Sequence, residues 1–182
     1  MKLDIVPTPT PAEQPWYADG LNFTCTCCGN CCTGGPGYVW ITLEEIARLA
    51  DHLKLSVKET IRRHCRKLGT RYSLKERQNP TTKSFDCIFL KEIPAPLNNG
   101  KEVDRIEQPK RVCGIYEVRP LQCRTWPFWD GNLASKQQWD KTSNTVCPGM
   151  STGKHYPLDR IEEIHHAKDW PVDGPTSASS KT

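Results

Sequence analysis

Ten cysteines are the residues of this chain with the clearest capacity for chemistry. Five of them fall within residues 25–32, in the order Phe-Thr-Cys-Thr-Cys-Cys-Gly-Asn-Cys-Cys from Phe23. Cys25, Cys28 and Cys31 form a C-x₂-C-x₂-C run, a spacing that lets one loop bring three thiolates to one centre, as in bacterial [4Fe–4S] proteins. Gly29 permits the tight backbone curvature that such a loop needs. The run therefore predicts a thiolate metal centre.

Cys32 follows Cys31 directly. Because successive side chains diverge, we expect both thiolates to bind one mononuclear ion only with strain, which favours two neighbouring sites. Zinc ribbons present two separate C-x₂-C knuckles, whereas this chain has one cluster and a Cys147-Pro148 pair, so iron–sulfur of the 4Fe–4S type is favoured over zinc. With four isolated downstream cysteines the ligands number eight, enough for two Cys₄ sites: Cys25, Cys28, Cys31, Cys32, Cys87, Cys113, Cys123 and Cys147.

The rest of the sequence indicates the cellular compartment and therefore the redox state expected for these thiols. The N-terminus has no apolar run typical of a signal peptide, and no segment approaches the ~18 apolar residues of a membrane span. We therefore expect a cytoplasmic protein without a membrane partner, whose reduced thiols act as ligands more readily than as disulfides. The formal charge of +4 would fall to zero with eight thiolates on two Zn²⁺ ions or two [4Fe–4S]²⁺ cores, so it does not indicate nucleic-acid binding.

The elements that must position the cysteines are short. Capping patterns at Thr42 and Ser56 predict helices over 43–53 and 57–68, and apolar spacing predicts a last helix over 158–168. Short strands are expected at 38–41 and 85–90, a helical turn at 116–122, and a turn-rich excursion at 94–100. The prediction is an α+β fold, a small, irregular, loop-rich, metal-stapled domain with two to three helices and short strands. Its expected bounds are a flexible segment at 1–20, the cysteine-cluster domain at 21–170 and a flexible tail at 171–182.

Several motifs together resemble a known family. FTCTCCGNCC, DCIFL, VCGIYEVRPLQCRTWPF and CPG occur in that order between about residues 23 and 150. They resemble the YkgJ-type CxxCxxCC cysteine-cluster family, a zinc- or iron-chelating domain related to a domain of flagellin lysine N-methylase. The resemblance implicates the same eight cysteines and also Tyr116, Arg119, Pro120 and Arg124. Cys27 and Cys65 fall outside its pattern.

Two arginines flank Cys123 and are candidates for binding the cofactor. Arg119 and Arg124 are expected to donate hydrogen bonds to thiolates or to a backbone carbonyl, which would offset negative charge. The apolar Thr125-Trp-Pro-Phe-Trp129 stretch makes an unpaired Arg124 costly and offers a core that excludes water. Cys65, on the apolar face of the helix predicted at 57–68, is expected to be a buried structural thiol. The pair His165-His166 is expected to compensate the dipole of the last helix.

Three functions are compatible with these residues. The favoured one is a metal-binding protein with a structural, electron-transfer or metal-handling role and a protein partner or client. The alternatives are a metal- or cluster-dependent enzyme that modifies a protein side chain, as the methylase resemblance implies, and a zinc-stabilised interaction module. The chain has no nucleotide-binding glycine loop and no serine-hydrolase elbow.

Overall fold

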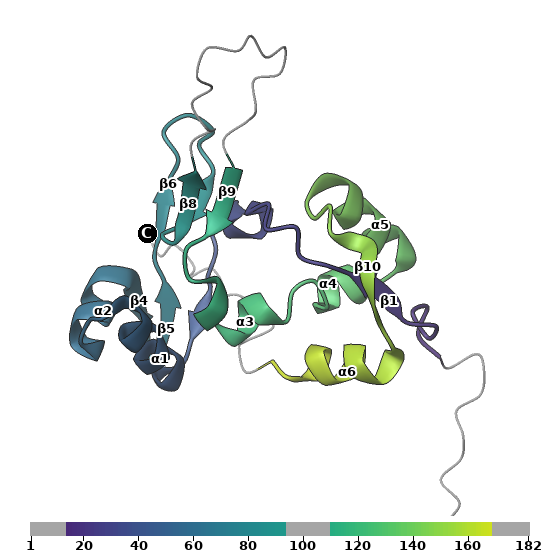
Figure 1. The fold of residues 1–182 in the computed structure, drawn as a ribbon, viewed down its shortest axis with the longest axis horizontal. Helices are drawn as coiled ribbons and strands as arrows, with labels where there is room; N and C mark the ends of the chain where they lie inside the picture. Colours follow the sequence, from purple (N-terminus) through teal and green to yellow (C-terminus); the bar gives the residue numbers. More distant parts are fainter. Residues whose placement is uncertain (1–13, 94–109, 169–182) are drawn as a thin grey trace, which may run out of the picture. The chain divides into compact units, whose positions relative to one another are not determined.

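The computed structural model describes residues 14–93 and 110–168 (Figure 1). Within them the fold is α+β and loop-rich, as predicted, although six α-helices are present instead of two to three. Chain contacts divide the described residues into two compact units. Unit 1 combines residues up to Thr24 with 127–166, and unit 2 runs from Cys25 to Trp126. The excursion expected at 94–100 and the tail expected at 171–182 lie outside the described residues.

Unit 2 is built from three small antiparallel sheets and two principal helices. The sheets have the strand orders β3-β5-β4, β2-β7-β6 and β8-β9. In chain order the elements are η2 (Asn30–Cys32), β2 (Thr33–Gly34), β3 (Trp40–Ile41), α1 (Leu43–Leu53), α2 (Val57–His64), β4 (Cys65–Leu68), β5 (Arg71–Leu74), β6 (Glu76–Gln78), β7 (Phe85–Cys87), β8 (Leu90–Ile93), β9 (Lys110–Cys113), η3 (Tyr116–Val118) and α3 (Leu121–Arg124).

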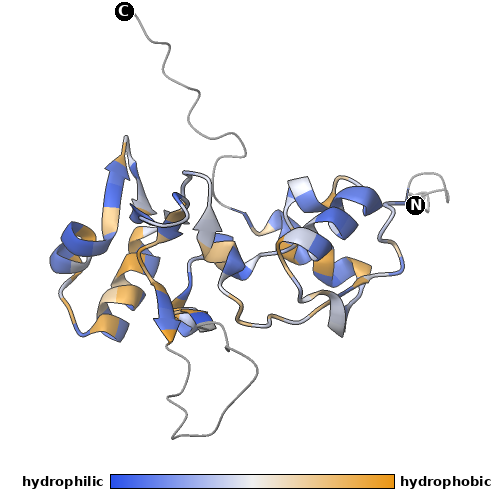
Figure 2. Ribbon diagram, turned by 90° about the horizontal axis from the view of Figure 1, so that it is seen from above, coloured by the Kyte–Doolittle hydropathy of each residue, from blue (hydrophilic) through white to orange (hydrophobic). Residues whose placement is uncertain are grey.

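The helix α1 begins and ends where its sequence predicts. Thr42 accepts a hydrogen bond from the Glu45 backbone N–H, and the Glu45 side chain accepts from the Thr42 N–H, which completes a capping box. The apolar face of α1 packs into the core of unit 2. Figure 2 shows short hydrophobic segments of the chain alternating with hydrophilic ones. The buried members of this core are Ile41, Ile46, Leu49, Cys65, Leu74, Phe89 and Ile115.

The second predicted helix is too long by one turn. The helix α2 ends at His64, and Cys65 to Leu68 form strand β4, paired with β5 in the register Cys65↔Leu74 and Leu68↔Arg71. Cys65 and Leu68 fit helical spacing, but the backbone hydrogen bonds offered by β5 win over local propensity. Cys65 is buried in the core as expected, on a strand instead of a helix.

Unit 1 has its own aromatic core. Trp139 and Phe128 stack at a ring-centroid distance of 6.0 Å, and both are almost fully buried. Trp16 donates from Nε1 to the Leu133 carbonyl at 2.7 Å. The elements are β1 (Leu21–Phe23), α4 (Asp130–Leu133), α5 (Lys136–Thr145), β10 (Met150–Tyr156) and α6 (Leu158–His166), with β1 antiparallel to β10.

Candidate metal centre

A two-residue ladder ends next to Cys32 and Cys87. The strands β2 and β7 pair with Thr33 opposite Asp86, so the residues one step further along the two strands are Cys32 and Cys87. The Thr33 hydroxyl donates to the buried Asp86 carboxylate at 2.5 Å. Burial acts to raise the pKa of Asp86, but the hydrogen bonds it accepts outweigh burial and hold that pKa below its usual value. A buried, ionised carboxylate thus fixes the register next to two predicted ligands.

The cysteine loop is held against the β8–β9 hairpin through Gly29 and Asn30. Gly29 has φ +72°, and a Cβ there would lie 2.8 Å from Leu90 Cδ1 and 2.9 Å from Arg111 Cβ. Arg111 donates a hydrogen bond to the Asn30 side chain. Since β8 pairs with β9 in the register Leu90↔Cys113, the same hairpin carries Cys113 to the loop. Only a residue without a side chain meets both demands at position 29.

Cys123 is positioned by hydrogen bonds of the two residues that precede it. The helix α3 has only four residues, but Glu45 accepts from the Leu121 N–H at 2.6 Å and so caps it. Gln122 accepts from the Trp40 N–H at 2.7 Å and donates to the Tyr38 carbonyl at 3.2 Å. These contacts join α3 to α1 and β3, so a helix too short to be stable alone holds Cys123 in place.

Five thiols of unit 2 interact with one another: Cys31, Cys32, Cys87, Cys113 and Cys123. The Sγ atoms of Cys31 and Cys32 lie 3.9 Å apart. Hydrogen bonding with Cys32 lowers the pKa of Cys31 to about 7 and that of Cys113 to about 6, while it raises the pKa of Cys32 itself. Burial raises the pKa of Cys87 to about 11 and that of Cys123 well above its usual range. The group thus combines readily ionised thiols with thiols that stay protonated at neutral pH.

The Sγ atoms of the adjacent Cys31 and Cys32 lie about as far apart as two ligands of one zinc ion. A tetrahedral zinc site with Zn–S bonds of ~2.3 Å separates its sulfurs by about 3.8 Å. The observed 3.9 Å meets that spacing, because the chain turns through the 3₁₀ helix η2 and the two side chains do not diverge. The number of sites stays a prediction. Among the described residues, however, no three cysteine sulfurs all lie within 4.8 Å of one another.

A second group of side chains lies at the start of the loop. The Tyr116 hydroxyl hydrogen-bonds to Cys25, which raises the pKa of Tyr116, and Cys27 is close enough to contribute to the same effect. Cys27 has a left-handed backbone with φ +54°, an uncommon conformation for a residue with a side chain. The guanidinium carbon of Arg119 lies 3.6 Å from the centroid of the Tyr116 ring. Arg119 Nε also donates a hydrogen bond to the Tyr116 backbone carbonyl at 2.8 Å. Cys28, between the two groups in sequence, is half-buried.

The two predicted arginines have different surroundings. The positive charge of Arg119 helps to lower the pKa of Cys31 and Cys113, so it lies near the thiols. Arg124 instead donates to the Glu45 carboxylate at 3.3 Å, a partner that differs from the thiolate or carbonyl expected from the sequence. The reason is that Glu45, needed to cap α3, is itself buried and draws the nearest cation.

Other sequence-derived candidates lie elsewhere. Cys65 belongs to the core of unit 2, and burial raises its pKa to about 11. Cys147 is buried in unit 1, where its N–H donates to the Thr142 carbonyl at 2.9 Å, so its place in the ligand set stays a prediction. Phe128, expected to shield the centre, packs on Trp139 in unit 1. Sequence reasoning missed the positioning roles of Asp86 and Gln122, since no motif marks them, and saw only the capping role of Glu45.

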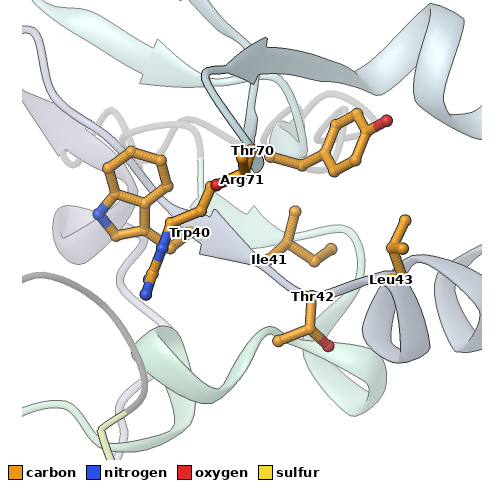
Figure 3. A pocket seen from close by; sticks show the side chains of 7 residues that line it. Trp40, Ile41, Thr42, Leu43, Thr70 and Arg71 are labelled. Atoms are coloured by element: carbon orange, nitrogen blue, oxygen red, sulfur yellow. The ribbon is translucent and has the colours of Figure 1, made fainter.

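A shallow pocket also opens in unit 2 (Figure 3). It measures about 240 Å³ and is lined by Trp40, Ile41, Thr42, Leu43, Thr70, Arg71 and Tyr72. This volume is below the ~300–1,000 Å³ of ligand pockets, and no cysteine lines it.

A loop, two strand ends and a short helix bring thiols together in unit 2, and thiolates are the ligands of structural zinc and of iron–sulfur centres. A sequence model of the CxxCxxCC family, described as "Putative zinc- or iron-chelating domain", matches residues 24–148, and the chain belongs to this family. An uncharacterized protein of Methanocaldococcus jannaschii, MJ0661, is 29% identical over 113 residues, which are 62% of this chain and 48% of that protein. The chain thus spans about half the length of this curated relative.

No solved structure matches the chain. In the part of the chain that the structure describes, no helix is long and apolar enough to cross a membrane.

Proposed function

We propose that unit 2 carries an iron–sulfur centre of the 4Fe–4S type, bound by thiolates drawn from the seven predicted cysteines of that unit. One observation supports this proposal above others: five interacting thiols gather, yet no three sulfurs among the described residues lie mutually within 4.8 Å. A mononuclear zinc ion needs four sulfurs about 3.8 Å apart, whereas a cluster binds each thiolate through a different iron and so accepts wider spacing. An iron–sulfur centre supplies one-electron chemistry when it is bound.

The chain's own residues suit this task. Cys31 is exposed while Cys87 and Cys113 border the apolar core, so the proposed centre has one edge at the surface and the other in a poorly solvated environment. Arg119 supplies positive charge that offsets part of the thiolate charge. A surface edge favours transfer of electrons or metal to a protein partner over a purely structural role.

Zinc is the second candidate, on the strength of the Cys31–Cys32 pair. The Sγ atoms of this pair are 3.9 Å apart, and two sulfur ligands of a tetrahedral zinc ion are ~3.8 Å apart. In this alternative both residues bind one ion together with Cys113, whose sulfur hydrogen-bonds to Cys32. The centre would then stabilise unit 2 and present no redox chemistry.

Purification without oxygen, followed by metal and acid-labile sulfide analysis and an electronic spectrum, separates these candidates. Iron and sulfide in equal amounts with a broad absorption near 400 nm support the cluster. A colourless protein that contains zinc and no sulfide overturns it in favour of zinc. Cys113→Ser should lose most of the bound metal, and the buried Cys65→Ser, used as a matched control, should retain it. Retention of full metal content in Cys113→Ser would remove Cys113 from the ligand set.

A further inference from the structure

A second cluster of ligand-type side chains lies in unit 1, on the helix α6. Glu162, His165 and His166 each place a potential ligand atom within 4.8 Å of the other two. Their spacing of i, i+3 and i+4 puts all three on one face of the helix. They follow the end of the family match at residue 148, so they are separate from the cysteine centre in sequence and in unit.

The distance between Glu162 and His165 is close to that of two ligands around one ion. Glu162 Oε2 lies 3.6 Å from His165 Nδ1 and 3.3 Å from His166 Nδ1. Nitrogen and oxygen ligands at ~2.0–2.1 Å from a tetrahedral zinc ion are separated by about 3.3–3.4 Å. A hydrogen bond from His165 Nδ1 to Glu162 would need an approach nearer 2.9 Å, so 3.6 Å suits two atoms that share a cation better than a donor and an acceptor.

His165 is oriented as metal-binding histidines are. Its Nε2 lies 2.6 Å from Asp130 Oδ1, a contact in which Nε2–H donates to the carboxylate. That contact leaves the Nδ1 lone pair directed away from Asp130, and Nδ1 is a buried atom without a hydrogen-bond partner. A carboxylate behind the imidazole fixes the tautomer and raises its basicity as a ligand. An unpartnered buried nitrogen facing a carboxylate is costly unless a cation lies between them.

The carboxylate and the second histidine are also suitably held. The Tyr17 hydroxyl donates to Glu162 Oε1 at 2.8 Å, which leaves Oε2 to face the histidines. His166 Nδ1 lies 2.9 Å from the Glu162 backbone carbonyl, and its side chain is 70% exposed, so the ring is able to turn and bind through either nitrogen. Dipole compensation, the role expected from the sequence, explains the exposed His166 but not the Asp130–His165–Glu162 chain.

We propose that Glu162, His165 and His166 form a binding site for a divalent zinc-class cation, with Asp130 as a positioning residue. Two imidazoles and one carboxylate are a ligand set suited to zinc and its first-row neighbours. Three protein ligands leave the fourth position to water or to a donor from a partner. The site stabilises the end of unit 1 by tying α6 to α4 through Asp130.

The test uses the full-length protein with its cysteine centre already loaded and titrates Zn²⁺ alone by calorimetry. One additional ion should bind, and Glu162→Gln and His166→Ala should weaken its binding by at least tenfold. Asp130→Asn should weaken it about 10- to 100-fold, as expected for a residue that orients a ligand. Glu163→Gln, an exposed neighbour on the same helix that pairs with Arg160, is the matched control and should bind zinc like the wild type.

Cobalt distinguishes this site from the thiolates. Co²⁺ bound here should give weak visible bands without the intense near-ultraviolet thiolate charge-transfer absorption, and His166→Ala should abolish those weak bands. Because His166 is mostly exposed, this variant should fold normally, as circular dichroism will verify. No added zinc bound by the wild type, or equal binding in the wild type, Glu162→Gln and His166→Ala, would refute the site. Neither outcome bears on the proposed cysteine centre.

Discussion

Glu45 Oε1 accepts the backbone N–H of Leu121 at 2.6 Å, although the two residues are separated by 76 positions in the sequence. The same carboxylate group closes the capping box of α1 and pairs with Arg124. One buried acid therefore starts two helices, of which the second carries Cys123. The contribution of Glu45 to the stability of the fold is consequently larger than that of an ordinary helix cap.

Replacement of Glu45 by alanine should destabilise the metal-free protein by about 2–3 kcal/mol. The change leaves the Leu121 N–H without its acceptor and removes half of the capping box. Urea unfolding followed by circular dichroism measures the loss. Glu44→Ala, at the exposed neighbouring position, serves as control and should leave the urea midpoint almost unchanged. Equal effects of the two substitutions would contradict the role assigned to Glu45.

Gly29→Ala should weaken both folding and metal binding. The new methyl group would lie 2.8 Å from Leu90 Cδ1 on a backbone with φ +72°, so the loop must shift away from the β8–β9 hairpin that carries Cys113. We expect a stability loss of about 1–2 kcal/mol from the left-handed backbone alone. Gly35→Ala is the control, since nothing lies within 4 Å of its added Cβ. Thermal unfolding and metal content of both variants should be compared.

Alkylation of the metal-free protein should be selective at neutral pH. A pKa lowered to about 7 leaves about half of Cys31 as thiolate at pH 7, against about 1% for a thiol of pKa 9. Iodoacetamide should therefore modify the exposed Cys31 well before the buried Cys65, whose pKa is about 11. Peptide mass spectrometry over time gives the order. Faster modification of Cys65 would show that the pKa pattern is wrong.

The stability of the metal-free protein should fall as the pH is lowered from 9 to 5.5. Folding lowers the pKa of Cys31 to about 7 and that of Cys113 to about 6, below the ordinary thiol value. At a pH between the folded pKa and the ordinary value, the unfolded chain therefore binds more protons than the folded protein. The stabilisation is present above the unfolded pKa and is lost as the pH falls through 7 and 6. Urea midpoints from pH 9 to pH 5.5 test this, and Cys113→Ser should show a smaller slope.

Arg119→Gln should raise the pKa of Cys113, because the guanidinium charge favours the thiolate. The pH at which Cys113 reaches half of its maximal alkylation rate should therefore increase relative to the wild type. Arg124→Gln is a matched control, since Arg124 pairs with Glu45. If both variants shift the profile equally, the effect is one of net charge and not of Arg119.

Local signals in the sequence predicted α1 because its capping box and apolar spacing agree. They failed at Cys65 to Leu68, where helical spacing competes with pairing to β5, a partner that local patterns do not reveal. They also missed α5, because its residues are mostly polar and only Trp139 and Thr142 are buried. Helices of this composition form through tertiary packing more than through propensity.

The motif spacing named candidate ligands but could not give their geometry. The positions of Cys87 and Cys113 depend on strand pairs β2–β7 and β8–β9, which join residues far apart in the chain. The spacing of Cys31 and Cys32 depends on the 3₁₀ turn through η2, which sequence reasoning took for a simple divergence of side chains. Ligand identity is a property of residue type, whereas ligand distance is a property of the fold.

Because β2 pairs with β7, the cysteine loop is synthesised well before the strand that lies next to it in the folded protein. Thr33 meets Asp86 only when 53 further residues have been made, and Cys123 comes later still. During translation the five clustered cysteines of residues 25–32 therefore leave the ribosome well before the strands and the helix that complete their surroundings. In that interval they are reactive thiols without a fold to shelter them. A centre that uses Cys123, as proposed, would be completed only after that residue has emerged, and until then the nascent chain would need a reducing environment.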